Sequence, residues 1–261
     1  MGTVSVESVD LRFGKPGAGQ VIALDGLSME IPDKQFAVIV GPSGCGKSSL
    51  LDVIAGLRDP SGGACKIDGK TIDGPGKDRG MVFQNYSLFP WLTVLRNVEF
   101  GLSLQGKPQK EITERARYYV NAVGLSSFES AYPNQLSGGM KQRVAIARSL
   151  ANDPQVILMD EPFGALDSQT RVVMQQLLLG IWEKEHKTVL FVTHDIDEAL
   201  YLGEKVYVMS ARPGRIIDTI SVGFVHPRSY ELATSPEFIE LKRRIQHSLH
   251  AEVHKALSSV A

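Results

Sequence analysis

The chain has 261 residues, of which 43% are apolar, enough to bury one large core with or without an appended segment. Lys and Arg number 28 against 29 for Asp and Glu, and this balance argues against nucleic acid as the main partner. The two cysteines, Cys45 and Cys65, are too few for a disulfide framework and favour a reduced, cytoplasmic compartment.

Targeting and membrane-spanning segments are not expected. Residues 1–7 lack the basic start and apolar core of a secretion signal, and no apolar run approaches the ~20 residues that span a bilayer. We therefore expect a soluble chain that reaches a membrane only through a partner.

The first part of the chain has the pattern of short strands. Apolar residues alternate at Val4, Val6 and Val9, and again from Val21 to Leu24, on either side of a turn region at 14–19. This pattern predicts an N-terminal antiparallel sheet.

A buried strand, a glycine-rich loop and a helix come next. The strand is the apolar run 36–40, and the helix carries Leu50, Leu51, Val53 and Ile54. Further buried strands are predicted at 156–159 and 189–192, with a long helix between them at 170–184. The expected core is a parallel sheet covered by helices.

Two helical regions complete the predicted organisation. Helical periodicity at Ile112, Ala116 and Tyr119 predicts a helical subdomain inserted at 87–152. In the tail, Ser235 is the expected N-cap and Pro236 the first helical residue. The apolar positions of this amphipathic helix are Phe238, Leu241, Ile245, Leu249 and Val253. It either packs on the core or makes a dimer or regulatory contact.

The glycine-rich loop matches the phosphate-binding P-loop pattern, and it stands between a strand and a helix as the mechanism requires. Its glycines let backbone N–H groups turn toward phosphates, and the helix N-terminus adds partial positive charge. Lys47 is expected to reach the β- and γ-phosphates and Ser48 to ligate Mg²⁺. The predicted nucleotide contacts are Gly41, Pro42, Ser43, Gly44, Cys45, Gly46, Lys47, Ser48 and Ser49.

An apolar strand at 156–159 ends in two adjacent carboxylates, Asp160 and Glu161. Successive strand side chains point to opposite faces, so the two acids have different tasks. We assign Asp160 to the Mg²⁺ shell and Glu161 to the attacking water as general base. The alternative is a pair of solvated acids at a strand end. Together with the P-loop, the pair in its catalytic interpretation predicts an α/β fold of the P-loop NTPase (RecA-like) kind with bound ATP and Mg²⁺.

Residues 136–143 decide between the many P-loop classes, because they resemble the signature motif of the ABC ATPases. The other marks of that family follow in the expected order: Gln84 in 81–84, Gly164 to Asp167, and His194 in 192–195. The resemblance covers most of residues 1–215 and implies an ATPase domain at 1–222, with 223–261 as a C-terminal extension.

The resemblance also implies roles for single residues. Gln84 senses Mg²⁺ and the γ-phosphate, and His194 contacts the γ-phosphate. Asp167 contacts a facing subunit, and Phe13 stacks on adenine. Taken alone, Gln84 would be a surface amide, His194 a strand-end histidine and Phe13 a core aromatic residue.

The signature residues Ser137, Gly138 and Gly139 open a helix and present free N–H groups to phosphate. In the family they complete the ATP site of a partner, so two subunits, identical or closely related, pair head to tail around two ATP molecules. Two departures from the common pattern stand outside the phosphate contacts: Met140 replaces Gln, and Lys34-Gln35 replaces Gly-Glu.

Transport is favoured over DNA repair and translation, because the chain has one compact cassette without an inserted coiled coil or a basic excess. Phe89 and Trp91 suit a groove for a helix of a permease, although core packing is the alternative. Residues 90–94, 132–133, 135–140 and 208–216 resemble the nitrate, sulfonate, taurine and bicarbonate branch of importers. This predicts an ATPase at the cytoplasmic face of the inner membrane, held there by transmembrane permease subunits and served by a substrate-binding protein. A non-transport ABC ATPase is the alternative, and a P-loop kinase a third.

Overall fold

The computed structural model describes residues 1–14 and 19–258. The chain forms two compact units, Met1–Gly76 with His186–Ala261, and Lys77–Glu185. Part of the predicted turn at 14–19, residues 15–18, lies outside the described residues. Among the described residues, no helix is both long and apolar enough to cross a membrane.

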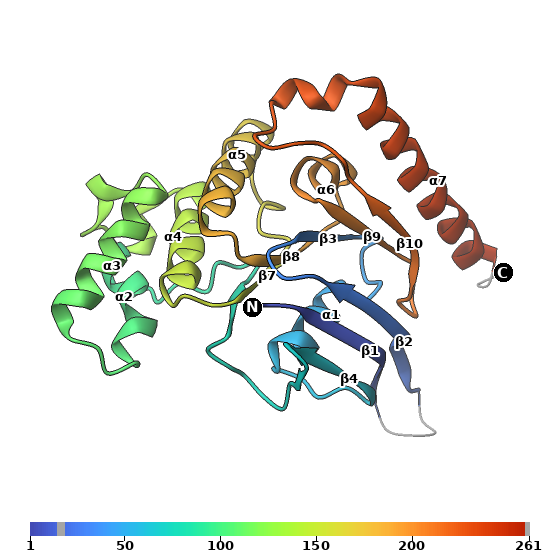
Figure 1. Cartoon of the computed structure of the whole chain (residues 1–261), viewed down its shortest axis with the longest axis horizontal. Coiled ribbons are helices and arrows are strands. Elements are labelled where there is room, and N and C mark those ends of the chain that lie inside the picture. The colour runs from blue at the N-terminus through green and yellow to red at the C-terminus, as the bar shows by residue number, and fades with distance from the viewer. Residues whose placement is uncertain (15–18, 259–261) are drawn as a thin grey trace. The chain divides into compact units, whose positions relative to one another are not determined.

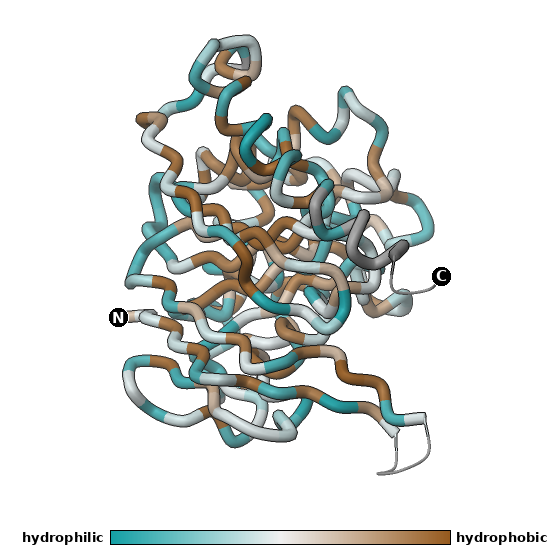
Figure 2. The backbone as a smooth tube through the Cα atoms, turned by 90° about the vertical axis from the view of Figure 1, so that its right-hand side faces the viewer, coloured by the Kyte–Doolittle hydropathy of each residue, from teal (hydrophilic) through white to brown (hydrophobic). Residues whose placement is uncertain are grey.

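The first unit contains the predicted antiparallel sheet, with strand order β2-β1-β4-β5. Its strands are β1 (Val4–Phe13), β2 (Val21–Ile31), β4 (Gly62–Ile67) and β5 (Lys70–Thr71). Val4 and Val6 are buried, and the register shifts before Val9, with Ser8 at a φ of 46°. Brown and teal segments alternate along the hairpin of β1 and β2, as expected for a sheet with one buried face (Figure 2).

The same unit contains a parallel sheet. Strand β3 (Phe36–Val40) lies between β8 (Thr188–Thr193) and β9 (Lys205–Met209), and it is parallel to both. The edge strand β10 (Ile216–Ser221) is antiparallel to β9. Every residue of β3 and of β8 is buried, which explains their unbroken apolar runs. Helices α1 (Lys47–Ala55) and α6 (Ile196–Leu202) follow β3 and β8.

The C-terminal segment packs on the unit that carries it. A 3₁₀ helix, η3 (Tyr230–Thr234), precedes α7 (Pro236–Ser258), and the Ser235 hydroxyl accepts a hydrogen bond from the Phe238 N–H at 3.2 Å, as predicted for an N-cap. Phe238 and Ile245 are buried, and α7 lies beside α6, β9 and β10 (Figure 1). The side chain of Val253, predicted on the apolar face, lies outside the described residues.

The second unit pairs two parallel strands, β6 (Arg79–Val82) and β7 (Val156–Asp160), and adds helices. Residues 87–152, all of them described, contain no strand. They form α2 (Val94–Ser103), α3 (Gln109–Ala122), η1 (Ser126–Phe128), η2 (Pro133–Gln135) and α4 (Gly138–Ala151), seen in green in Figure 1. Helix α5 (Ser168–Glu185) spans slightly more than the predicted 170–184. The predicted fold class is confirmed by this arrangement and by the structural neighbours given below.

Candidate functional site

The glycine-rich loop joins β3 to α1 in the first unit. Gly46 is the N-cap of α1 with a φ of 111°, and a Cβ there would lie 2.9 Å from the carbonyl oxygen of Ala23. Gly44 has a φ of 75°, and no described atom lies within 4 Å of where its Cβ would be. Both positions require glycine backbone freedom, and the loop borders open space where the first N–H groups of α1 begin.

Lys47 holds the loop closed on itself. Its ammonium donates to the carbonyl oxygens of Gly41 and Pro42, each at 2.9 Å, and the residue is 4% exposed. The side chain of Cys45 is buried, whereas Ser43 and Ser48 are exposed. The serine hydroxyls of the loop are therefore exposed, while the Lys47 ammonium is held by backbone carbonyl oxygens of the loop.

The predicted histidine lies at the same sheet edge as the loop. In the parallel pair of β3 and β8, Val40 is opposite Thr193. Gly41 and His194 are therefore the first residues after the ends of two neighbouring strands. His194 is exposed, and the next residue, Asp195, caps α6 by accepting from the Glu198 N–H at 3.1 Å. The carboxyl ends of parallel strands are where ligands bind in α/β sheets.

Phe13 is the last residue of β1 and is partly buried. The guanidinium carbon of Arg58 lies 4.9 Å from the centre of its ring. Phe13 lies in the same unit as the phosphate loop and His194.

In the second unit, Gln84 and Glu161 converge. Val82 is opposite Met159 in the parallel pair of β6 and β7, so Gln84, Asp160 and Glu161 all lie at one sheet edge. A Cβ on Gly164 would lie 3.7 Å from Glu161 Oε2 and 3.8 Å from Gln84 Nε2. The two polar groups therefore approach the same small residue.

The signature residues begin α4, as predicted. Ser137 is the N-cap, and its hydroxyl accepts from the Met140 N–H at 3.3 Å. Ser137 and Gly138 are exposed, while a Cβ on Gly139 would come within 2.8 Å of Thr170 Cγ2. Gly139 allows α4 to approach α5 closely, and the exposed turn leaves the helix N-terminus accessible.

Asp167 precedes α5 in a similar way. Its Oδ1 accepts from the Thr170 N–H at 3.0 Å, and its backbone oxygen accepts from Arg171. Hydrogen bonds from Thr170 hold the pKa of Asp167 below its usual range, so this exposed carboxylate is charged at neutral pH.

Two residues that the sequence analysis missed fix the loop after Gln84. Asn97, fully buried on α2, accepts from the Phe89 N–H, and its two amide hydrogens are shared among the carbonyl oxygens of Phe89, Leu92 and Thr93. Arg148 on α4 donates to the carbonyl oxygens of Tyr86 and Ser87, at 3.0 and 2.6 Å. An Asn or Arg in a helix has no local signature for such a role, although Asn97 stands among apolar residues that α2 buries.

The loop presents an aromatic patch, formed by Phe89, Trp91 and Phe100. Their ring centres lie 4.4 Å apart for Phe89 and Phe100 and 5.7 Å apart for Phe89 and Trp91. Phe89 is partly buried, but Trp91 is 70% exposed, so core packing does not account for the tryptophan. Exposed aromatic rings of this kind mark a surface for a partner.

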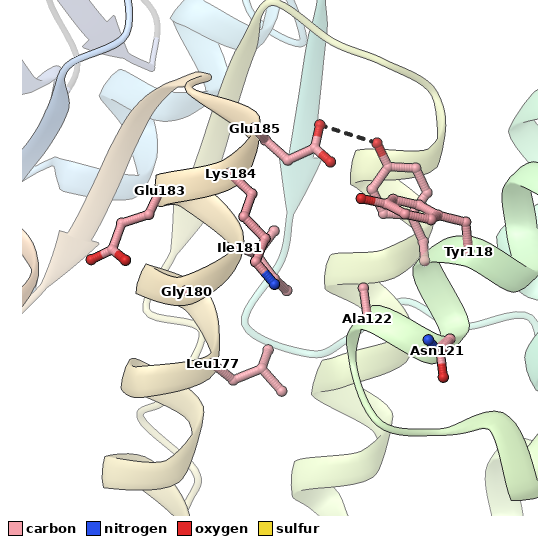
Figure 3. A pocket seen from close by; sticks show the side chains of 10 residues that line it. Tyr118, Asn121, Ala122, Leu177, Gly180, Ile181, Glu183, Lys184 and Glu185 are labelled. Atoms are coloured by element: carbon pink, nitrogen blue, oxygen red, sulfur yellow. Dashed lines mark hydrogen bonds between the residues drawn. The ribbon is translucent and has the colours of Figure 1, made fainter. Parts of the chain in front are cut away.

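A separate pocket of about 510 Å³ lies between α3 and α5 in the second unit. Figure 3 shows its walls, with Leu177 and Ile181 on one side and Tyr118 and Ala122 on the other. At its rim Tyr119 donates to Glu185 at 3.3 Å. None of the predicted site residues lines it.

The side chains that the sequence analysis assigned to Mg²⁺ carry oxygen donors; Ser48 belongs to the first unit, and Gln84 and Asp160 belong to the second. Among the described residues no group of three or more His, Cys, Asp or Glu side chains forms a metal cluster. Mg²⁺ does not need one, because it keeps several waters and is held by one or two protein oxygens and substrate phosphates. The hydroxyl of Ser48, the amide of Gln84 and the carboxylate of Asp160 are oxygen donors of that kind.

The family model described as ABC transporter matches residues 24–164. The chain belongs to the ABC transporter family. It is 54% identical to an uncharacterized ABC transporter ATP-binding protein of Methanocaldococcus jannaschii, covering 97% of this chain and 94% of that protein. It is 49% identical to the nitrate import ATP-binding protein NrtD of Synechocystis, covering 93% and 94% of the two chains. It is 46% identical to the taurine import ATP-binding protein TauB of Rhizobium johnstonii, covering 95% and 97%.

Solved structures agree with this assignment. A dimeric, post-hydrolysis state of the ATP-binding cassette MJ0796 bound to ADP and Pi is 36% identical, with a TM-score of 0.75 over 85% of this chain and 100% of that one. As a member of this family with the fold of an ATPase cassette, the chain is an ABC-type ATPase.

Proposed function

We propose that this ABC transporter chain hydrolyses ATP to power the uptake of a small oxyanion, such as nitrate, bicarbonate, an organosulfonate or taurine, through a separate permease. The chain is the ATP-binding subunit of an importer, and its likeness over nearly its whole length to nitrate, taurine and sulfonate import proteins carries this conclusion. The oxyanion itself does not bind this chain.

The phosphate loop binds the nucleotide in this proposal. Its open backbone at Gly44 and the first N–H groups of α1 receive the phosphates, with residues Gly41 to Ser49 around them. Lys47 exchanges its carbonyl acceptors for phosphate oxygens, and His194 at the same sheet edge contacts the γ-phosphate. Phe13 stacks on adenine.

Hydrolysis is assigned to the residues that converge in the second unit. Glu161 accepts a proton from the attacking water, and Gln84 senses Mg²⁺ and the γ-phosphate. Ser48 of the first unit and Gln84 and Asp160 of the second would hold Mg²⁺, which would neutralise developing charge on the phosphates. Glu161 directly follows β7, and this position at the end of a strand supports the proposed role.

Two kinds of partner follow. A second copy, or a close relative, pairs head to tail, and its Ser137, Gly138 and Gly139 complete the ATP site while Asp167 contacts the facing subunit. Permease subunits bind the aromatic patch and hold the chain at the cytoplasmic face of the membrane. A substrate-binding protein delivers the oxyanion to the permease.

The first experiment tests ATP hydrolysis. Lys47→Ala removes the cation that neutralises the β- and γ-phosphates, so we expect the rate of phosphate release to fall to background. Lys70→Ala, at an exposed position in β5 of the same unit, is the matched control and keeps the wild-type rate. A Lys47→Ala variant with unchanged ATPase activity would contradict the assignment of the phosphate loop.

The second experiment tests transport. The chain is purified with its associated membrane proteins, reconstituted in vesicles, and assayed for uptake of nitrate, bicarbonate, taurine and an alkanesulfonate. Uptake of one of these that depends on ATP supports the proposal. Copurification with a ribosome or with DNA in place of a permease would instead favour a non-transport ABC ATPase.

A further inference from the structure

We infer that Arg58 is a positioning residue for the nucleotide base, because its guanidinium stacks on one face of Phe13 and holds the ring so that adenine stacks on the other. The inference rests on the proposed role of Phe13 in nucleotide binding. The guanidinium carbon lies 4.9 Å from the centre of the Phe13 ring. Arg58 itself is exposed, so this contact is not a consequence of core packing.

The backbone that carries Arg58 is fixed against β1. The Ser61 N–H donates to the Asp10 carbonyl at 2.7 Å, and the Arg12 N–H donates to the Ser61 hydroxyl at 3.0 Å. Strand β4 then continues the pairing, with Gly62 opposite Asp10. Arg58 is therefore held next to the end of β1, where Phe13 lies.

The other end of this segment is fixed by the end of α1. Gly56 ends the helix with a φ of 74°, and a Cβ there would come within 2.1 Å of the Gly74 carbonyl oxygen. The Leu57 N–H donates to the backbone carbonyl oxygen of Asp52 at 2.9 Å. Since α1 begins at the phosphate loop, this short helix connects the phosphate contacts at one end to Arg58 at the other.

The stacking has a consequence for base binding. A phenyl ring has negative faces, so a cation on one face is attracted to it and draws electron density away from the other. This reduces the electrostatic repulsion between that second face and the electron-rich face of a purine. Stacking of a base on an aromatic ring is tolerant of base identity, so Arg58 strengthens the binding of ATP and GTP alike.

Calorimetry with the full chain tests the inference. We expect Arg58→Ala to raise the Kd of ATP and of GTP by at most about 2- to 5-fold, because a cation–π contact at an exposed site is itself worth no more than that. The Kd of inorganic tripolyphosphate, which has no base, stays unchanged. Arg58→Lys, which keeps the charge but not the planar group, recovers part of the affinity. Arg243→Ala, an exposed arginine of α7 in the same unit, is the matched control.

Three outcomes would overturn the inference. An unchanged Kd for ATP would show that Arg58 does not position the ring, and an equally raised Kd for tripolyphosphate would show that it binds phosphate. Arg58 also interacts electrostatically with Asp52. Burial raises the pKa of Asp52, and the charge of Arg58 offsets part of this increase. If Asp52→Asn raised the Kd as Arg58→Ala does, Arg58 would act through that carboxylate.

A fourth variant separates this inference from the proposed function. Phe13→Ala should raise the Kd of ATP more than Arg58→Ala does, and adding Arg58→Ala to it should have no further effect. If Phe13→Ala binds ATP as wild type does, the adenine assignment itself is wrong and the inference falls with it. If Phe13→Ala weakens ATP binding and Arg58→Ala does not, only the inference is wrong.

Discussion

Glu161 occupies an unusual backbone conformation directly after β7. Its φ is 40°, in the left-handed region that long side chains seldom adopt, and its carbonyl oxygen accepts from the Gly164 N–H at 3.1 Å. Backbone strain of this kind costs on the order of 1–3 kcal/mol and persists where the surroundings impose it, often at active sites. In this conformation the Glu161 carboxylate and the Gln84 amide both approach Gly164.

The proposed base predicts a specific kinetic defect. Glu161→Gln keeps the size and the backbone conformation but cannot accept a proton, so we expect hydrolysis to slow by ~10²-fold or more. The Kd of ATP should change little, because the side chain acts on the water. Single-turnover hydrolysis measures the rate, with the exposed Glu114→Gln on α3 as the control. Wild-type hydrolysis by Glu161→Gln would refute the assignment.

At the scale of elements, Asn97 on α2 determines the shape of the loop that carries the aromatic patch. Its NH2 group shares two hydrogens among three backbone oxygens, and its carbonyl oxygen accepts from one N–H. Asn97→Asp is nearly isosteric but loses these donated bonds and buries a charge. Each buried group left unpaired costs about 1–3 kcal/mol.

Asn97→Asp should therefore lower the free energy of unfolding by about 2 kcal/mol or more. If the aromatic patch binds the permease, ATP-driven uptake should fall more than basal hydrolysis does. Urea unfolding and vesicle uptake measure the two effects. Asn121→Asp is the control, because Asn121 is exposed and accepts a hydrogen bond from Ser126, which an aspartate also does. Equal loss of uptake in both variants would contradict this role.

A second element, α7, is attached to β10 by an ion pair. Arg244 donates to both carboxylate oxygens of Asp218, at 2.9 and 2.6 Å, and these bonds lower the pKa of Asp218. A carboxylate with a lowered pKa in the folded state contributes stability above its unfolded pKa of about 3.9, and the contribution disappears as the pH falls through the folded pKa.

The pair is partly exposed, so we expect Asp218→Asn to cost only about 0.2–1 kcal/mol at neutral pH. The difference between the variant and wild type should shrink as the pH falls below about 4, since protonation of Asp218 removes the same charge. Chemical unfolding at neutral pH and along this acid range measures the effect. Arg244→Gln should behave in the same way, and the double variant should show no further loss. A difference that persists at low pH would mean that Asp218 acts through packing.

For the whole molecule, the proposed pairing of two subunits uses the exposed start of α4. If Ser137, Gly138 and Gly139 of one subunit close on ATP bound to the other, Glu161→Gln should accumulate as a dimer with Mg-ATP, because the bound nucleotide is not consumed. Wild type should return to separated subunits. Size-exclusion chromatography distinguishes the two. A Glu161→Gln protein that remains monomeric at saturating ATP would contradict the shared site.

Ser137→Asp makes this test sharper. Aspartate is as good an N-cap as serine, so α4 and the unfolding midpoint should be preserved. The added carboxylate would face a phosphate of the partner's ATP, and like charges repel. We therefore expect Ser137→Asp to abolish the ATP-bound dimer of Glu161→Gln without changing ATP binding by the monomer. A double variant that still forms the dimer would show that Ser137 does not face the partner's nucleotide.

Local pattern alone predicted the strands β1, β2, β3, β7 and β8, the long helix α5, the position of the phosphate loop and the N-cap of α7, but not the strands β4, β5, β6, β9 and β10. In each case the physical signal lies within a few residues: an apolar period, a glycine where φ is positive, or a serine before a proline. Tertiary structure alone decided what Asn97, Arg148 and Arg58 do, because each contacts backbone or a ring that is distant in sequence or displaced by a turn. The fold also bears on one departure from the family. Gly is common at position 34 because the φ there is positive, and Lys34 adopts a φ of 65° while it donates its N–H to the Thr188 hydroxyl. A sequence gives the residue at such a position, but the partner that stabilises its conformation is supplied by the fold.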